Sequence, residues 1–247
     1  MKQASDKKID NLLMNDNIKR QMLEKFDGCD GGDPGSPQSP SIWLFGIEHG
    51  WPQKNDREPP VDDDESYSVD MQRQWPYNRN AFKLLAALHG LPVEEYLTFA
   101  YKTKPFTAGS RGYFKGNLYP YACHSVGAWP ENAARESGFE DKQSYQAWCS
   151  EHRLPAIKRW VDEYQPSIFI GTGNTYARDF SKACYGKEAL LEERRITING
   201  HTKKILLGNE SGRKLVVIPH LSGGRNGLNS NTALTQVGVI IRAFMTT

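Results

Sequence analysis

The sequence lacks the features of membrane-spanning and exported proteins. It contains no run of about 18 apolar residues, which is the length that a membrane-spanning helix requires. Its first twenty residues include neither an apolar signal core nor a small-residue cleavage site. We therefore expect a cytoplasmic protein that does not associate with membranes.

Cysteines are few and widely separated. The chain has four of them, Cys29, Cys123, Cys149 and Cys184. No pair has the two-residue spacing that zinc and iron–sulfur sites use. We expect free reduced thiols, with no metal and no other cofactor. A metal site assembled from distant cysteines is the alternative.

Acidic residues are scarce in one part of the chain. Residues 151–247 carry 14 basic and 8 acidic residues, whereas residues 1–150 carry 17 basic and 21 acidic ones. Within residues 194–225 one acidic residue, Glu210, stands against seven basic ones: Arg194, Arg195, Lys203, Lys204, Arg213, Lys214 and Arg225. Such a concentration of positive charge indicates a polyanionic partner. An ordinary solvated face is the alternative.

The first forty residues differ in pattern from the rest. Apolar residues recur at helical spacing through residues 6–26. The following stretch, CDGGDPGSPQSPS, is rich in Gly, Pro and Ser and is interpreted as flexible. We therefore divide the chain into an N-terminal helix with a flexible linker, residues 1–40, and a second domain, residues 41–247. Residues 54–70 are polar and acidic, and an exposed loop is expected there.

Apolar segments separated by helical patterns predict an α/β fold. The segments are residues 42–46, 114–118, 167–170 and 215–218. This alternation is typical of a parallel sheet with helices on both faces. We expect a three-layer α/β/α fold around a central four-stranded, mostly parallel sheet.

Helical spacing predicts helices in this domain over residues 80–88, 143–164 and 176–184, and the end of the chain, residues 233–245, is interpreted as a helix packed on the sheet. A break in the second helix is expected at Pro155, because proline disrupts a helix interior. Asn174 or Thr175 is expected to cap the third helix.

Two shorter patterns predict strands. Alternating residues flank Asn199-Gly200, a pair favoured in tight turns, and predict a β-hairpin near residues 194–207. Residues 96–101 (YLTFAY) are interpreted as a short strand.

Polar side chains lie near the ends of the predicted strands. Glu48 and His49 follow the first strand, Asn117 belongs to the end of the second, and His220 follows the fourth. In parallel sheets, chemistry gathers at the carboxyl ends of the strands. We therefore expect Glu48, Asn117 and His220 to surround one cavity.

These segments resemble the uracil-DNA glycosylase superfamily. Gly46-Ile47-Glu48-His49-Gly50 is similar to the motif after that family's first strand, and Asn117 is similar to the asparagine of its second. PSIFIGTG resembles its glycine-ended third strand, and the helix RNAFKLLAALHGL resembles the one after the first motif. Pro219-His220-Leu221-Ser222 resembles the loop after its fourth strand. The resemblance extends over roughly residues 41–246 and implies that family's fold.

The chain departs from the family pattern at three positions. Glu48 stands where many members have Asp or Asn, and His49 and Leu221 stand where they have Pro. The iron–sulfur cluster of some branches is not carried over, because the close cysteine pair is missing. We interpret these departures as a change of substrate more than of fold.

The resemblance implies a monofunctional DNA N-glycosylase. Such an enzyme flips a base out of DNA, hydrolyses its N-glycosidic bond and leaves an abasic site. The base is either uracil or another deaminated base, or a hypermodified cytosine of phage DNA, as in anti-phage defence. DNA is the expected partner, and no obligatory protein partner is indicated.

Three residues have the chemistry that this reaction needs. Glu48 can favour a sugar cation and activate water, and His220 can donate to the departing base. The amide of Asn117 offers a donor and an acceptor to a base edge. His49 is expected to shape the base pocket or contact a phosphate. The alternatives are a helix cap for Glu48, a turn for Asn117, and a bond to nearby backbone for His220.

The loop after the fourth strand is the expected DNA contact, formed by Leu221, Ser222, Gly223, Gly224 and Arg225. Its glycines let backbone amides approach a phosphate closely, and Leu221 or Arg225 can fill the gap left by the flipped base. Lys203 and Lys204 of the hairpin are expected near the DNA backbone. A flexible surface loop is the alternative.

An aromatic ring is expected to stack on the flipped base. The candidates are Phe45 and Trp51 beside the first motif, and Trp75 and Tyr77 before the following helix. The sequence leaves all four open.

Two other functions compete with base excision. A non-catalytic nucleic-acid-binding protein of the same fold would bind in a salt-dependent manner without forming abasic product. A small-molecule hydrolase that uses Glu48 and His220 would not need the basic hairpin.

Overall fold

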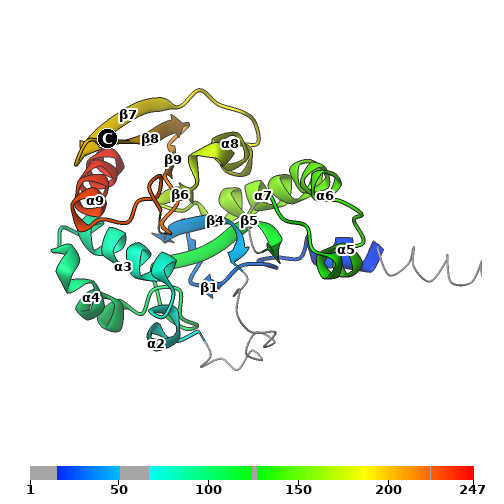
Figure 1. The fold of residues 1–247 in the computed structure, drawn as a ribbon. Helices are drawn as coiled ribbons and strands as arrows, with labels where there is room; N and C mark the ends of the chain where they lie inside the picture. Colours follow the sequence, from blue (N-terminus) through cyan, green and yellow to red (C-terminus); the bar gives the residue numbers. More distant parts are fainter. Residues whose placement is uncertain (1–15, 51–66, 124–126, 223) are drawn as a thin grey trace, which may run out of the picture.

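Seven strands form one mixed sheet in the computed structural model, which describes residues 16–50, 67–123, 127–222 and 224–247 (Figure 1). The strand order across the sheet is β1-β5-β4-β6-β9-β8-β7. In that order the strands span Gly31–Gly32, Tyr113–Cys123, Ile42–Gly50, Ile168–Thr172, Arg213–Ile218, His201–Glu210 and Glu192–Ile198. A small second sheet pairs β2 (Gly35–Ser36) with β3 (Ser39–Pro40).

The predicted α/β fold is confirmed, but the sheet has more than the four predicted strands. β5, β4, β6 and β9 run parallel to one another. The hairpin β7–β8 pairs antiparallel with β9 and so extends the sheet instead of standing apart from it. The other edge is closed by β1, which is antiparallel to β5. Apolar runs identified only the buried strands, because β7 is exposed along most of its length.

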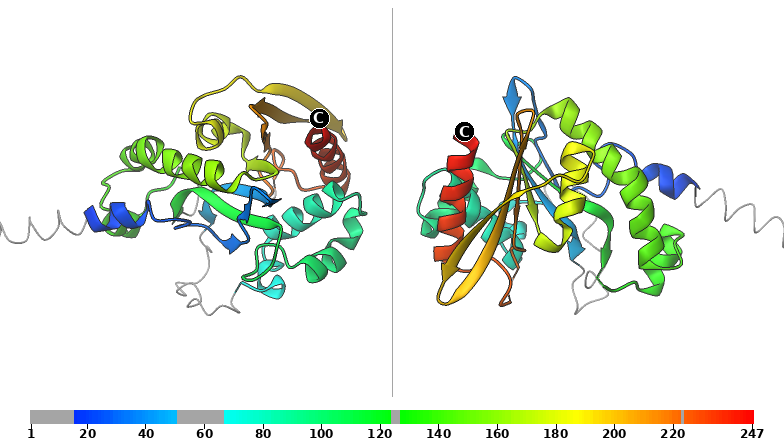
Figure 2. Two further views of the ribbon diagram at one scale, coloured as in Figure 1. Left: turned by 180° about the vertical axis from the view of Figure 1, so that it is seen from behind. Right: turned by 90° about the horizontal axis from the view of Figure 1, so that it is seen from above.

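Helices cover both faces of the sheet (Figure 2). One face carries α3 (Pro76–Leu88) and α9 (Asn231–Thr246), and the other carries α7 (Leu154–Tyr164) and α8 (Ala177–Tyr185). The shorter helices are α2 (Val69–Gln72), η1 (Val93–Glu95), α4 (Tyr96–Thr103), α5 (Glu131–Ser137), α6 (Lys142–Trp148), η2 (Cys149–Arg153) and η3 (Asn174–Tyr176).

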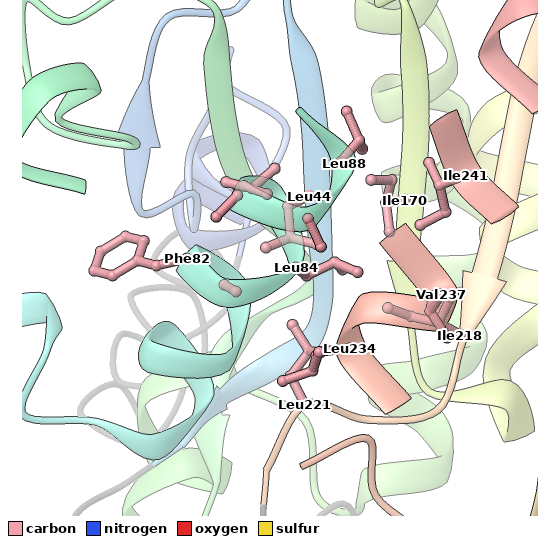
Figure 3. Close-up of a cluster of buried hydrophobic side chains, with 14 of the residues drawn as sticks. Leu44, Phe82, Leu84, Leu88, Ile170, Ile218, Leu221, Leu234, Val237 and Ile241 are labelled. Carbon is pink, nitrogen blue, oxygen red and sulfur yellow. The ribbon is translucent and has the colours of Figure 1, made fainter. Parts of the chain in front are cut away.

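The core beneath α3 and α9 is mainly aliphatic, with Phe82 of α3 among its buried side chains (Figure 3). Leu84 of α3 and Val237 of α9 pack there with Ile170 of β6, all fully buried. A side chain at Gly238 would collide with Ala87, so glycine permits the close approach of α9 to α3. The opposite core is rich in aromatic residues, including Trp43, Phe45 and Phe169.

The hairpin prediction is confirmed at residue level. Asn199 and Gly200 have φ angles of 49° and 74°, which both central residues of this tight turn require. β7 and β8 then pair without a register shift from Ile198–His201 to Glu192–Leu207.

One helical segment differs from its prediction, and a second has the predicted break. Residues 96–101, interpreted as a strand, lie in α4, where Phe99 and Ala100 are buried against the core beside α3. The helix predicted over residues 143–164 is interrupted by the π-helical turn η2, immediately before Pro155 in the first turn of α7. Proline is tolerated there because the first turn needs no intrahelical N–H donor.

The predicted cap of α8 is also wrong. Neither Asn174 nor Thr175 caps it; the capping position is Tyr176, without a side-chain hydrogen bond. Asn174 lies in η3 instead, and its amide donates to the Lys204 carbonyl of β8 over 2.9 Å. This bond ties the hairpin to the end of β6.

The segment predicted as a flexible linker packs on the sheet. Arg153 is fully buried and donates to the backbone carbonyls of Met22, over 2.7 Å, and of Asp27. The Phe26 ring contacts Phe114 with centroids 4.7 Å apart, and Gly31–Gly32 form β1. The predicted helix over residues 6–26 is described only from residue 16, and residues 16–21 are helical.

Candidate functional site

The parallel strands place the predicted polar residues along one edge of the sheet. Glu48 and His49 lie near the end of β4, and His220 directly follows β9. Asn117 lies within β5, opposite Gly46 of β4, and not at the end of its strand as predicted. β4, β5 and β9 point the same way, so these residues approach a common edge.

Glu48 is buried and paired with a lysine. Its Oε2 lies 2.5 Å from Lys142 Nζ, and the Glu48 side chain is only 5% exposed. Burial raises the pKa of the Glu48 carboxyl, although Lys142 offsets part of this rise. Oε1 of Glu48 is buried without a hydrogen-bond partner in the described part of the chain. One carboxylate oxygen is thus anchored, and the other is left to accept a hydrogen bond.

Lys142 was not found from the sequence. It begins α6, 94 residues after Glu48, and no local pattern connects the two. Nζ also donates to Cys123 Sγ over 3.1 Å. Burial lowers the pKa of the Lys142 ammonium, but its hydrogen bonds to Glu48 and Cys123 outweigh this and raise the pKa above its ordinary value. The lysine therefore remains a cation.

Asn117 is held by its amide nitrogen. Nδ2 donates to Asp30 Oδ2 over 3.1 Å and lies 3.1 Å from His49 Nε2. His49 Nε2 also lies 3.1 Å from the Gly28 carbonyl. Asn117 itself is 4% exposed. Asn117 and His49, which were both predicted to bind the base, are therefore in direct contact, and Asp30 accepts a hydrogen bond from Asn117.

Asp30 and Lys115 form a buried ion pair beneath this contact. Lys115 Nζ donates to Asp30 Oδ1 over 3.0 Å, to Tyr67 Oη over 2.7 Å and to Asn78 Oδ1 over 2.9 Å. All three ammonium protons are thereby used. Burial alone would raise the pKa of the Asp30 carboxyl, but Lys115 and His49 hold the pKa below its usual value.

This ion pair was also missed from the sequence. The available signal was Lys115 inside the apolar segment FKGNLY, since an unpaired lysine is rarely buried. Its partner Asp30 lies in the stretch interpreted as a linker, where acidic residues appear unremarkable.

His220 is fixed in one tautomer by the loop that follows it. The backbone N–H of Ser222 donates to His220 Nδ1 over 3.2 Å, and Ser222 Oγ lies 2.7 Å from the same atom. Since Nδ1 accepts the backbone hydrogen bond, the proton of the neutral ring is assigned to Nε2. Burial lowers the pKa of His220, which favours this neutral form.

Tyr77 connects the two halves of the site. Its ring lies 5.2 Å from the His220 ring, and its hydroxyl lies 2.9 Å from Thr172 Oγ1. Thr172 Oγ1 donates its proton to the Phe45 carbonyl over 3.1 Å. Tyr77 is therefore the donor to Thr172. A side chain at Gly46 would overlap Asn117 Oδ1 and come within 3.7 Å of Tyr77 Oη.

The structure links Asn117 to His49, and His220 to Tyr77, more directly than it links Glu48 to any of them. Asn117 Oδ1 and Tyr77 Oη both lie near Gly46, and the His220 ring lies beside that of Tyr77 at an angle of 50°. The Glu48 side chain turns toward α6, although its neighbour His49 contacts Asn117. Within the described residues, the predicted site is one polar edge with two parts.

The structure contradicts the prediction that Phe45 could stack on a flipped base. It is fully buried, and its ring packs 4.6 Å from that of Phe169. Strand alternation turns Phe45 to the face of the sheet under α7 and α8, away from Asn117. Trp51 lies outside the described residues. Among the other aromatic candidates, Tyr77 borders the site and Trp75 is 43% exposed.

The hairpin and the loop after β9 meet in an open groove. The groove has a volume of about 470 Å³ and is lined by Gly200, His201, Thr202, Lys203, Arg225 and Asn226. Lys203 Nζ donates to the Arg225 carbonyl over 2.6 Å. Lys203 and Arg225, which the sequence predicted as DNA contacts in two separate segments, are therefore neighbours. Gly224 adopts a φ of 100°, and Gly223 lies outside the described residues.

The positive patch is smaller than the sequence suggested. Arg194 pairs with Glu192, Arg195 and Lys204 pair with Glu193, and Arg213 pairs with Asp162. These carboxylates lie outside residues 194–225 and were not counted with them. In the described structure, Lys203, Lys214 and Arg225 have no carboxylate partner. Lys203 and Arg225 line the groove, whereas Lys214 Nζ donates to the Met245 carbonyl over 2.6 Å.

The prediction that Leu221 fills the gap of a flipped base is wrong. Leu221 is fully buried in the core with Leu234, and its carbonyl accepts a hydrogen bond from Asn80 Nδ2 over 2.7 Å (Figure 3). The Leu228 N–H donates to the His220 carbonyl over 2.8 Å and closes the loop. Leu221 is therefore the anchor of the loop, whereas Arg225 lines the groove.

Replacing Leu221 with Ala tests this assignment. We expect a loss of about 2–5 kcal/mol in the free energy of unfolding, the usual cost of removing a buried leucine side chain. The measurement is denaturant unfolding, with the exposed Leu190→Ala as the matched control because that residue is fully accessible. A variant that unfolds like the parent would show that Leu221 is not a core residue.

Metal and membrane features are absent from the described residues. No group of three or more His, Cys, Asp or Glu side chains there is arranged to hold a metal ion. Every helix in those ranges is too short or too polar to cross a bilayer.

Comparison with known proteins gives no relative. A scan against protein-family models finds no match, and a search of curated proteins finds no significant match.

Proposed function

We propose that this chain is a monofunctional DNA N-glycosylase with the three-layer α/β/α architecture of the uracil-DNA glycosylase superfamily. It flips a base out of DNA in the cytoplasm, hydrolyses the N-glycosidic bond and leaves an abasic site. The observation that carries the proposal is the His220 donor. Nδ1 accepts from the loop, so Nε2 carries the proton, and the ring lies 5.2 Å from that of Tyr77 at the carboxyl edge of the sheet. The Tyr77 hydroxyl and the Asn117 oxygen both lie near Gly46.

In the proposed reaction, the bond between C1′ and the base nitrogen breaks with its electron pair on the base. His220 Nε2–H donates to the oxygen that accumulates this charge. Burial lowers the pKa of His220 and favours the neutral ring. The neutral ring already carries a proton on Nε2, so it can donate a hydrogen bond to the leaving base without first taking up a proton. Backbone bonding of Nδ1 to Ser222 keeps Nε2 directed away from the loop.

Glu48 is assigned to the sugar side of the same reaction. Its anchored carboxylate favours the positive charge that develops at C1′, and its unpaired Oε1 accepts a proton from the attacking water. The water oxygen forms the new bond to C1′, and the proton passes to the carboxylate. Lys142 positions the acid through Oε2.

The state of Lys142 supports a monofunctional enzyme. A lyase step would need a neutral amine that attacks C1′. Glu48 and Cys123 raise the pKa of Lys142 and keep it protonated, so it is unsuited to that attack.

Replacing Lys142 with Gln tests the pairing through a pH profile. Lys142 lowers the pKa of Glu48, so its removal lets that pKa rise further. Because the ionised carboxylate is the active form, the acid limb of base release should move to higher pH. Lys158→Gln is the control, since Lys158 pairs with Asp162 on α7. An unchanged acid limb would refute the coupling of Lys142 to Glu48.

Two substrate classes are compatible with the proposal. One is uracil or another deaminated base, and the other is a hypermodified cytosine of phage DNA. An alkaline-cleavage assay for abasic sites, on normal, deaminated and phage-modified DNA, separates them. Abasic product from one class supports excision and identifies the substrate.

A non-catalytic nucleic-acid-binding protein is the second candidate. The observation that favours it is the tight pairing of Glu48 with Lys142, which turns the acid toward α6. Binding to every DNA in the panel with no abasic product would select this candidate.

Two neighbouring lysines provide a matched test of the DNA contact. Lys203 lines the groove without a carboxylate partner, whereas Lys204 pairs with Glu193 over 2.9 Å. Lys203→Gln should reduce the salt slope of DNA binding by about one unit, the value for one lost phosphate contact. Lys204→Gln should change it less. Equal slopes for both variants and the parent would place DNA elsewhere.

A further inference from the structure

The Asp30 carboxylate decides which atom of Asn117 faces a ligand. A carboxylate oxygen only accepts hydrogen bonds, so its contact with Asn117 identifies the nitrogen end of the amide. The same nitrogen lies 3.1 Å from His49, which encloses its other side. Neither N–H of Asn117 is therefore directed toward an incoming base.

The oxygen end of Asn117 is left as an acceptor. None of the described residues donates to Oδ1, and Oδ1 is not among their fully buried, unpaired atoms. Gly46 makes this position possible, because a side chain at residue 46 would overlap the oxygen. Without a Cβ at this point of β4, the acceptor lies directly above the strand.

Tyr77 supplies a second acceptor at the same place. Tyr77 donates its hydroxyl proton to Thr172 Oγ1, because Thr172 donates its own hydroxyl proton to the Phe45 carbonyl. Tyr77 Oη would lie 3.7 Å from a Cβ at Gly46, close to the Asn117 oxygen. Two oxygen acceptors thus border Gly46, and neither Asn117 nor Tyr77 has a free proton to donate there.

We propose that Asp30 is a positioning residue that makes this site selective for the exocyclic amino group of a flipped base. An amino group offers two N–H donors and can satisfy both oxygens, whereas a ring imide offers one. An oxo group would place a third acceptor against them. The inference rests on the proposed function and narrows it to amino bases, of which the 4-aminopyrimidine, cytosine, is the first choice. Modification at C5 leaves this amino group intact.

Binding to uncleavable DNA tests the inference separately from catalysis. The probes are single-stranded oligonucleotides of one sequence carrying a 2′-fluoroarabino cytosine, uracil or adenine, because fluorine at C2′ suppresses formation of the sugar cation. We expect cytosine to bind about tenfold more tightly than uracil, the size of one unmatched hydrogen bond. Equal or tighter binding of uracil would overturn the proposal, and tighter binding of adenine would move it to the purine amino group.

Two variants of the same polar cluster connect the preference to Asp30. Asp30→Asn frees the amide of Asn117 to rotate, and the tenfold ratio should fall to about twofold or less. Tyr67→Phe removes a hydrogen-bond partner of both Lys115 and Asp30 Oδ1, but it leaves the bond between Asn117 and Asp30 Oδ2 in place. It should keep the parent ratio. A folded Asp30→Asn variant with an unchanged ratio would refute the positioning role.

A measurement on the parent protein covers the case in which Asp30→Asn does not fold. The two side-chain amide protons of Asn117, assigned by their loss in Asn117→Ala, should exchange slowly with solvent because Asp30 and His49 enclose them. Fast exchange would contradict the orientation. The outcomes also separate the two proposals: a preference for the amino base without abasic product refutes excision alone, and excision of uracil over cytosine refutes amino selectivity alone.

Discussion

Glu48→Gln should lower the rate of base release by roughly 10²-fold or more, the usual size of a lost acid–base or electrostatic contribution. The amide cannot take the proton of the attacking water or balance the charge at C1′. Its oxygen can still accept from Lys142, so DNA binding and folding should persist. Single-turnover release of the base that the panel identifies is the measurement.

Glu163→Gln is the matched control for this variant. Glu163 also pairs with a lysine, Lys25, over 2.6 Å, but both side chains are about half exposed. Its replacement should leave base release unchanged. Equal rates for Glu48→Gln and the parent would remove the acid from the mechanism.

His220→Ala should lower base release by a similar factor, roughly 10²-fold or more. The reason differs: the donor to the departing base is lost, while the carboxylate on the sugar side remains. A base that leaves easily as an anion needs this donor least, so the defect should shrink for such a base. His152→Ala is the control, because His152 is exposed and pairs only with Glu151.

The pH dependence of stability gives a second readout for His220. Its folded pKa is lowered below the ordinary 6.5, so the unfolded chain takes up the proton first as the pH falls. The parent should therefore lose stability below about pH 6.5, until the folded ring is also protonated. His220→Gln cannot titrate, and its unfolding free energy should fall less over this range. Parallel pH curves for the two proteins would contradict a neutral, loop-bonded ring.

Several polar residues of the candidate site could be identified in the sequence, but the residues that form ion pairs and hydrogen bonds with them could not. Glu48, Asn117 and His220 could be predicted because each lies near the end of an apolar run. Asp30, Lys115 and Lys142 could not, because each reaches its partner across many residues of chain. Ion pairs of this kind depend on which loop covers which strand, and a local pattern carries no such information.

Leu221 and Phe45 show that a local pattern can also predict a functional role for a residue that belongs to the core. Both lie beside polar motif residues, and proximity in sequence predicted a role at the surface. Backbone direction decides otherwise: strand alternation turns Phe45 to the aromatic core, and the closed loop turns Leu221 under α3 and α9.

The sequence by itself determined the alternating α/β class, the buried parallel strands and the hairpin at Asn199-Gly200, because periodicity and turn chemistry act over a few residues. Only the tertiary structure decided that the hairpin joins the sheet, that Glu192, Glu193 and Asp162 neutralise most of the basic patch, and that Asp30 holds Asn117. These outcomes depend on charges and hydrogen bonds between segments that are distant in the chain and become neighbours only when the sheet is assembled.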